Sequence, residues 1–306
     1  MAFLGLKSRF HTVSCRKNGA FACFIRCMSS KSEASAEAFR LRIIFEDNHL
    51  LVVNKPSGIL SQGDSTGDES MFSIAKQYLA HCRGKSSDTS SVYLGLVHRL
   101  DRVSSGVLVF AKRTKAAARV SECLRTREGV EKHYLCVVHG DHPDGESIVL
   151  EDLLIEAAGT DSKNKTRIYS PTKSAVMSIQ NAVHARLEYR SLGPVEKHPP
   201  GISQSILHVQ PTTGRKHQIR AQLSHANMPI VWDGKYGAPA RSSKERGIAL
   251  HALSLLITHP APPGLPILFT APVPERWGIA FGNKVFDVAD KIIEQIEKEA
   301  NLNRKK

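Results

Sequence analysis

A short polar turn between two apolar runs carries the side chains best suited to chemistry. The runs at 94–97 and 107–111 predict two buried strands. The turn between them places one carboxylate, Asp101, among three basic or titratable side chains, His98, Arg99 and Arg102. Nearby positive charge favours the ionised form of a carboxyl group. Asp101 is therefore expected to be ionised, as a nucleophile has to be.

An isolated aspartate in a turn usually caps the turn or pairs with a neighbouring arginine. The residues around Asp101 favour more than that. The string His-Arg-Leu-Asp-Arg-Val-Ser-Ser-Gly, followed by Val-Leu-Val-Phe-Ala-Lys, resembles the signature loop of the RluA-type pseudouridine synthases. The resemblance implies that Asp101 is the catalytic nucleophile. Ser104 stands where the family usually has threonine, and this departure keeps the hydroxyl.

A second string, Gly-Arg-Lys-His-Gln-Ile-Arg at 214–220, resembles the motif that follows the strand closing the active site in that family. This resemblance implies that Arg220 forms an ion pair that holds Asp101, and that Ile219 lies near the base. A guanidinium presents a fork of donors that suits a carboxylate better than an ammonium does. Arg215 is assigned to substrate binding, and a basic helix lying on the RNA backbone would explain it equally well.

A third string, Glu-Lys-His-Tyr at 131–134, resembles the second motif of the family. It implies that Tyr134 lies beside the flipped base, where two roles stay open: stacking on the uracil and assisting removal of a proton. A lone tyrosine in a strand more often packs and hydrogen-bonds outward through its hydroxyl. The flanking match favours the role in the pocket.

Three further residues are assigned to substrate binding. Asn-Lys-Pro-Ser-Gly at 54–58 resembles the opening motif of the superfamily, so Lys55 is expected near the active site or the RNA backbone. A stacked base has to be flipped out before an enzyme can reach it, and the gap it leaves has to be filled. Arg99, next to the nucleophile, is the candidate for filling that gap or anchoring a phosphate, and His98 is grouped with it.

The spacing of apolar residues predicts the elements that position these side chains. Helical spacing occurs at 71–81, 114–125 and 285–296. Strands are predicted where the chain is rich in β-formers or alternates, at 41–45, 50–54, 130–140, 184–191 and 205–210. Residues 141–175 give no clear pattern apart from apolar pieces such as 148–155. The resemblance implies an α+β fold: a mixed, mainly antiparallel, bisected sheet with flanking helices and a central active-site cleft.

Composition divides the chain into three parts. Residues 1–32 contain no Asp or Glu but six Lys and Arg, which is typical of an organellar transit peptide. Residues 1–38 are therefore predicted to be a disordered leader and linker, with a tail of no address function as the alternative. The catalytic domain is expected at 39–283 and a C-terminal amphipathic helix at 284–306. The mitochondrion is the expected location and the plastid the alternative.

Charge indicates the class of partner. The formal net charge is +13. Without the six Lys and Arg of residues 1–32, the rest of the chain has 36 Lys and Arg and 29 Asp and Glu. A basic surface favours polyanions. RNA is expected rather than DNA, and no membrane is expected because no apolar run approaches the length of a membrane span. The six cysteines lack metal-ligand spacing and no phosphate-binding loop occurs, so neither a metal nor a cofactor is expected.

By resemblance, the expected reaction is the isomerisation of uridine to pseudouridine in organellar rRNA, tRNA or mRNA. A non-catalytic RNA-binding scaffold in organellar ribosome assembly would have the same basic surface, but it does not need Asp101, Tyr134 and Arg220 together. A hydrolase built on Asp101 and His98 lacks the second carboxylate or nucleophile–base pair of such enzymes. One further departure affects a turn, since Trp232 stands where the family usually has glycine.

Overall fold

One sheet runs through the whole molecule. The structure is a computed structural model that describes residues 41–84, 88–145, 147–155, 166–169, 182–239 and 247–302. Within these residues the main order of strands is β1 (Ile43–Glu46), β2 (Leu50–Lys55), β4 (Ser105–Ala111), β10 (Leu250–Thr258), β5 (Glu131–His139), β9 (Gln204–Pro211), β8 (Ala182–Pro194), β6 (Ile148–Ile155) and β7 (Arg167–Tyr169). Two short strands pair at its sides, β3 (Gly95–Leu96) with β4 and β11 (Pro266–Thr270) with β10.

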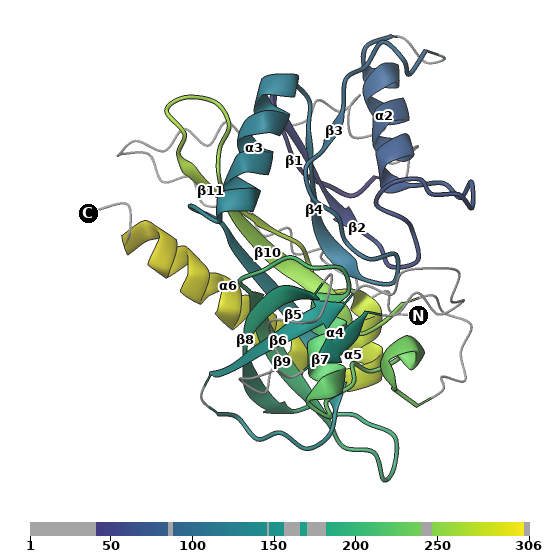
Figure 1. Ribbon diagram of the computed structural model, residues 1–306, viewed down its shortest axis with the longest axis vertical. Coiled ribbons are helices and arrows are strands. Elements are labelled where there is room, and N and C mark those ends of the chain that lie inside the picture. The colour runs from purple at the N-terminus through teal and green to yellow at the C-terminus, as the bar shows by residue number, and fades with distance from the viewer. Residues whose placement is uncertain are drawn as a thin grey trace, which may run out of the picture.

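Antiparallel pairing dominates this sheet. Among the described strands only β4 and β10 pair in parallel, with His251 opposite Ser105 and Ala252 opposite Gly106. This short contact joins an amino-terminal half, built on β1, β2 and β4, to a carboxy-terminal half that begins with β10 and continues through β5, β9, β8, β6 and β7 (Figure 1). The predicted mixed, mainly antiparallel sheet in two parts is confirmed.

A glycine makes the close approach of the two halves possible. Gly106 has φ +118°, and a Cβ on it would lie 2.2 Å from the carbonyl oxygen of Ala252. A larger residue would force β4 and β10 apart. The hydroxyl of Ser105 and Nδ1 of His251 hydrogen-bond at 2.9 Å across the same contact. Since Asp101 lies just before β4, the junction of the halves sets the position of the predicted nucleophile.

Helices cover both halves. The amino-terminal half carries α2 (Met71–Cys82) and α3 (Thr114–Thr126). α2 begins at Ser70, whose hydroxyl accepts a hydrogen bond from the amide of Ser73 in a capping box. The carboxy-terminal half carries α4 (Gln218–His225), the 3-10 turn η1 (Gly234–Tyr236), α5 (Glu275–Phe281) and α6 (Lys284–Leu302). Both predicted internal helices are confirmed to within one residue at their ends.

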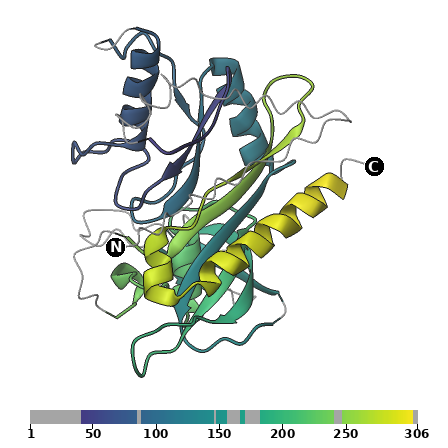
Figure 2. The ribbon, with the colours of Figure 1, turned by 180° about the vertical axis from the view of Figure 1, so that it is seen from behind.

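The last helix belongs to the main core. One face of α6 is buried, with Val285, Ala289, Ile292 and Ile296 between 0% and 7% exposed. These side chains pack in the same cluster as Leu135 of β5 and other residues of the carboxy-terminal half. Figure 2 shows α6 lying across the sheet, with α5 beside its start. The predicted amphipathic helix is therefore an integral part of the fold.

Two predicted segments differ in the structure. The run at 94–97 forms only the two-residue strand β3, because β10 already occupies the same edge of β4 at Ser105 and Gly106 and leaves only its far end free. Residues 148–155, where the pattern was unclear, form β6, which lies near the rim of the sheet and keeps Ile148 50% exposed. Six of its eight residues are apolar, but Glu151 and Asp152 stand side by side in its middle, so the run lacks the alternation that indicates a half-buried strand.

Three features considered in the sequence analysis, namely the leader, membrane spans and metal ligands, are not found among the described residues. The predicted leader at 1–38 lies outside the described residues. None of the helices described is long and apolar enough to cross a membrane. Within the same residues, His, Cys, Asp and Glu side chains form no group of three that could hold a metal ion.

Candidate active site

One arginine of α4 joins two carboxylates. Arg220 donates from Nη1 to Oδ2 of Asp101 at 2.9 Å, and from Nε and Nη2 to the two oxygens of Asp233 at 2.7 and 2.9 Å. The side chains of Arg220 and Asp233 are 5% and 1% exposed, whereas that of Asp101 is 25% exposed. Asp233 therefore fixes the guanidinium by a bidentate pair and leaves Nη1 for the carboxylate that reaches solvent.

The guanidinium of Arg220 is charged as well as fixed. Burial alone lowers its pKa, but the hydrogen bonds and charges of Asp233 and Asp101 outweigh burial and raise the pKa above its usual value. The guanidinium carbon also lies 4.9 Å from the ring centroid of Tyr236, within range of a cation–π contact. The ion pair between Arg220 and Asp101 is thus present, on an arginine with little freedom to move.

A buried lysine supports the backbone around Asp101. Lys55, at the end of β2, is 0% exposed, and its Nζ donates to the carbonyl oxygens of Pro56, Arg102 and Ser104 at 3.0, 3.3 and 2.7 Å. Burial lowers the pKa of Lys55 to about 7, although the charge of Asp101 acts to raise it. The assignment of Lys55 to RNA binding is therefore corrected, because its Nζ supports the loop of Asp101 and does not reach the surface.

Replacing Lys55 by methionine is expected to lower the free energy of unfolding by about 2 kcal/mol, because buried carbonyl oxygens lose their donor. Urea denaturation measures the change. Lys115→Met is the matched control, since Lys115 is exposed on α3. Equal stability of the Lys55 variant and the wild type would contradict a supporting role.

The same residue predicts a pH dependence. The pKa of Lys55 is about 7 in the folded chain, below the ordinary value of 10.5, so the unfolded chain binds one more proton between these values. The free energy of unfolding contributed by Lys55 therefore rises as the pH rises from about 7 toward 10.5. We expect Lys55→Met, but not Lys115→Met, to flatten this part of the stability profile.

Tyr134 of β5 interacts electrostatically with Asp101. Its side chain is half-buried and packs against the main core cluster. Burial first, and then the negative charge of Asp101, raise the pKa of Tyr134 to about 12. The phenol is therefore protonated at neutral pH and is a poor base. Of its two predicted roles, packing against a base fits this environment better than removal of a proton.

His217 also lies next to Asp101. Its Nε2 is 3.9 Å from Oδ2 of Asp101, and its Nδ1 is 3.0 Å from the hydroxyl of Tyr236. That hydroxyl also accepts a hydrogen bond from the amide of Thr166 at 3.0 Å. Burial lowers the pKa of His217 to about 4 despite the attraction of Asp101, so its ring is neutral at physiological pH. The positive charge in contact with Asp101 is thus that of Arg220.

His98 and Arg99 line an open pocket of about 600 Å³ together with Gln62 and Phe72. Nε2 of His98 accepts a hydrogen bond from the amide of Val109 at 3.0 Å, and burial lowers the pKa of His98 to about 3. The imidazole is therefore neutral and tied to β4, whereas Arg99 is exposed and available to a ligand.

Ile219 and Arg215 take different positions at the start of α4. Ile219 is 8% exposed and packs in the main core cluster. Arg215 is exposed, and its Nε donates to the carbonyl of His184 at 3.1 Å. The charge of Arg215 also acts on Arg127. Burial lowers the pKa of Arg127, Tyr134 acts to raise it, and Arg215 acts to lower it. Positive charge is therefore concentrated near Tyr134.

The sequence analysis missed Asp233, His217 and Tyr236, which complete the surroundings of Arg220 and Asp101. The sequence offered only a weak signal for Asp233, the apolar run Ile230, Val231 and Trp232 directly before it. A buried carboxylate requires a cation, but only the packed structure shows that Asp233 is buried. Arg220, thirteen residues earlier, is that cation.

Comparison with known proteins identifies similar chains. The family model described as RNA pseudouridylate synthase matches residues 49–225. Ribosomal large subunit pseudouridine synthase C of Buchnera aphidicola subsp. Baizongia pistaciae is 31% identical over 241 residues, which are 77% of this chain and 68% of the relative. Ribosomal large subunit pseudouridine synthase D of Nitrosomonas europaea is 33% identical over 251 residues, 78% of this chain and 64% of the relative.

Other relatives act on a different RNA or share only the fold. tRNA pseudouridine synthase C of Pectobacterium carotovorum is 30% identical and covers 82% of this chain and 65% of its own length. The solved structure of human RNA Pseudouridylate Synthase Domain Containing 4 covers 84% of this chain and 97% of its own, with a TM-score of 0.59 and 23% identity. The chain thus spans about two thirds of these bacterial relatives. By its matched motifs, its fold and these relatives, the chain belongs to the RNA pseudouridylate synthase family of RNA-modifying isomerases.

Proposed function

We propose that this protein converts uridine to pseudouridine within RNA, with Asp101 as the nucleophile. The observation that carries the proposal is the position of the Asp101 carboxylate. It is 25% exposed, on a loop supported by Lys55, and held at 2.9 Å by an arginine that Asp233 fixes from behind. A carboxylate that is oriented and open to solvent is suited to attack a substrate.

The reaction needs no outside reagent. The glycosidic bond between N1 and C1′ breaks, the detached uracil turns, and its C5 bonds to the same ribose carbon. C5 loses a proton and N1 carries one in the product, so atoms and electrons balance. Asp101 supplies the nucleophile, Arg220 orients it, and Tyr134 packs against the base. The neutral ring of His217 leaves the charge on Asp101 available.

The target nucleotide has to leave its stack to reach Asp101. Arg99 is exposed two residues before Asp101 and has a guanidinium suited to filling the gap or binding a phosphate. Arg215 and Arg127 add positive charge near Tyr134. Binding driven by such charges releases counterions, so affinity for RNA is expected to fall steeply with salt.

Organellar RNA is the substrate class we propose. The relatives named above act on ribosomal large subunit RNA or on tRNA, and both classes occur in organelles together with mRNA. The acid-free, basic residues 1–32 support import, into the mitochondrion first and the plastid second. A reporter fused to residues 1–38 is expected to enter that organelle. A reporter that stays outside would contradict the location without affecting the chemistry.

Pseudouridine mapping of organellar RNA tests the function and names the substrate. Cells that lack the protein, and cells that carry only Asp101→Ala, are expected to lose the same one or few sites, which the wild-type gene restores. If all sites persist in both lines while only the deletion disturbs the organelle, a non-catalytic RNA-binding scaffold becomes the better account. Loss of sites in the deletion alone would remove Asp101 from the mechanism.

A further inference from the structure

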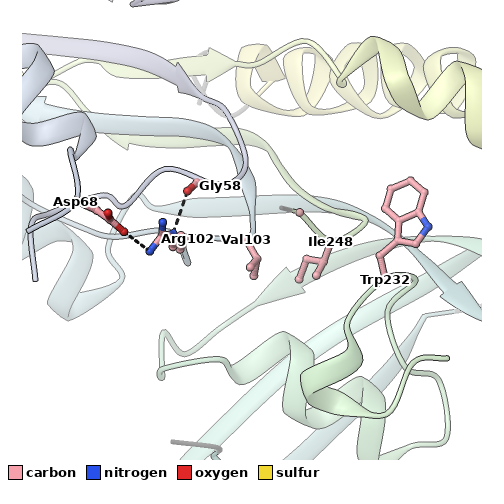
Figure 3. Close-up of a pocket in the computed structure, with 7 residues that line it drawn as sticks. Gly58, Asp68, Arg102, Val103, Trp232 and Ile248 are labelled. Atoms are coloured by element: carbon pink, nitrogen blue, oxygen red, sulfur yellow. Dashed lines mark hydrogen bonds and ion pairs between the residues drawn. The ribbon is translucent and has the colours of Figure 1, made fainter. Parts of the chain in front are cut away.

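A second cavity lies directly beside the loop of Asp101. It measures about 590 Å³, and its lining includes Arg102, Val103, Trp232 and Ile248. Arg102 and Val103 follow Asp101 in the chain, and Trp232 precedes Asp233, the anchor of Arg220. Figure 3 shows Val103 and Ile248 between Arg102 and Trp232. The cavity is therefore lined by the chain neighbours of both carboxylates of the candidate active site.

The backbone at Trp232 is unusual for so large a residue. Its φ is +71°, in the left-handed region that glycine adopts freely. Bulky residues are rare there and persist only where the surrounding structure enforces them. The aromatic side chain at this position is therefore kept against a conformational cost, which points to a use for the ring.

The indole is held in place yet remains partly accessible. It stacks on Phe281 with ring centroids 4.9 Å apart and planes inclined by 26°, and the guanidinium of Arg276 lies 5.5 Å from its centroid. Trp232 is nevertheless partly exposed and lines the cavity, whereas the other tryptophan of the chain, Trp277, is 0% exposed. The part of the ring that stays exposed beside Phe281 and Arg276 is what a base can contact.

The opposite wall is also formed in advance. Arg102 donates from Nε to the carbonyl of Gly58 at 3.0 Å, and Nη1 pairs with Asp68 at 2.7 Å (Figure 3). The amide of Gly58 donates to the carbonyl of Arg102 at 2.7 Å, and the amide of Ile248 to that of Val103 at 3.0 Å. These bonds join three separate segments of the chain around the cavity. Its shape therefore does not depend on a ligand.

We infer that this cavity binds a nucleotide of the substrate RNA that flanks the target uridine. The base stacks on Trp232 and contacts the apolar side chains of Val103 and Ile248, while Arg102 lies near the phosphate. The size suits this occupant, since ligand sites of about 300 to 1,000 Å³ hold molecules of nucleotide size. The inference rests on the proposed function, because it takes the ligand to be RNA.

Tryptophan fluorescence tests the contact separately from the reaction. Random-sequence single-stranded RNA is titrated into the purified full-length protein, and filter binding measures affinity in parallel. Stacking of a base on Trp232 is expected to quench the emission of the wild type. In Trp232→Gly, which suits the positive φ, only buried Trp277 emits, and RNA is expected to leave that emission unchanged. The variant is also expected to bind RNA about tenfold more weakly.

Leu265→Gly is the matched control, because Leu265 is an exposed apolar residue just before β11. It lies beside the end of β10 that is remote from the junction with β4. This control is expected to quench and bind as the wild type does. RNA binding without quenching, or wild-type affinity in Trp232→Gly, would overturn the inference. Quenching by RNA, together with persistence of every mapped pseudouridine in cells that lack the protein, would support the cavity and overturn the proposed reaction. Absence of RNA binding by the wild type would overturn both.

Discussion

Asp101→Asn is expected to abolish pseudouridine formation while the protein stays folded. Asparagine has nearly the shape of aspartate, and its carbonyl oxygen can still accept from Nη1 of Arg220, but an amide is not a nucleophile. Arg220 also keeps both hydrogen bonds to Asp233. Removal of a nucleophile costs a factor of about 10⁴ or more in rate. Purified protein is assayed for product on the RNA that mapping identifies.

Two measurements separate a chemical defect from a structural one. Because Asp101 is 25% exposed, its loss of charge leaves no buried group unpaired, and urea unfolding should match that of the wild type within about 1 kcal/mol. Glu122→Gln provides the control, since Glu122 is an exposed residue of α3 paired with Arg125. Full activity in Glu122→Gln with none in Asp101→Asn is the expected pattern. Residual product in purified Asp101→Ala would refute the nucleophile.

The sequence predicted the partners of the central ion pair but not its anchor. Asp101 and Arg220 are 119 residues apart, and only the resemblance of two strings to one family suggested that they meet. No such resemblance marks Asp233, because an aspartate before glycine is typical of an ordinary turn. Its role depends on burial, and burial arises only when α4, η1 and the strands pack together.

Lys55 shows the same limit from the opposite direction. A lysine in a turn is usually solvated, so sequence favours a role at the surface. In the fold, β2 pairs with β4, which brings Lys55 opposite Gly106 and under the carbonyls of the loop that carries Asp101. Periodic elements such as α2 and α3 were predictable because their signals are local. The support of Asp101 was not, because it depends on pairing between distant strands.

Arg220→Met is expected to cost both stability and activity. Asp233 is 1% exposed and would be left as a buried charge without a partner, which destabilises a fold by about 3 to 5 kcal/mol. Asp101 would lose the cation that orients it. Urea denaturation and the rate of product formation measure the two losses. Since an unstable enzyme is also a poor one, this variant alone does not show that Arg220 positions Asp101.

The double variant Arg220→Met, Asp233→Leu makes that distinction. Replacing a buried ion pair by apolar residues of similar volume is often neutral, so stability is expected to return to within about 1 kcal/mol of the wild type. Activity is expected to remain as low as in Arg220→Met, because Asp101 is still without its arginine. Asp233→Leu alone should lose less stability than Arg220→Met, since Arg220 keeps its ion pair with Asp101. If activity returned together with stability, Arg220 would serve only the fold, and the orientation of Asp101 would have to come from Lys55 and the loop that it supports.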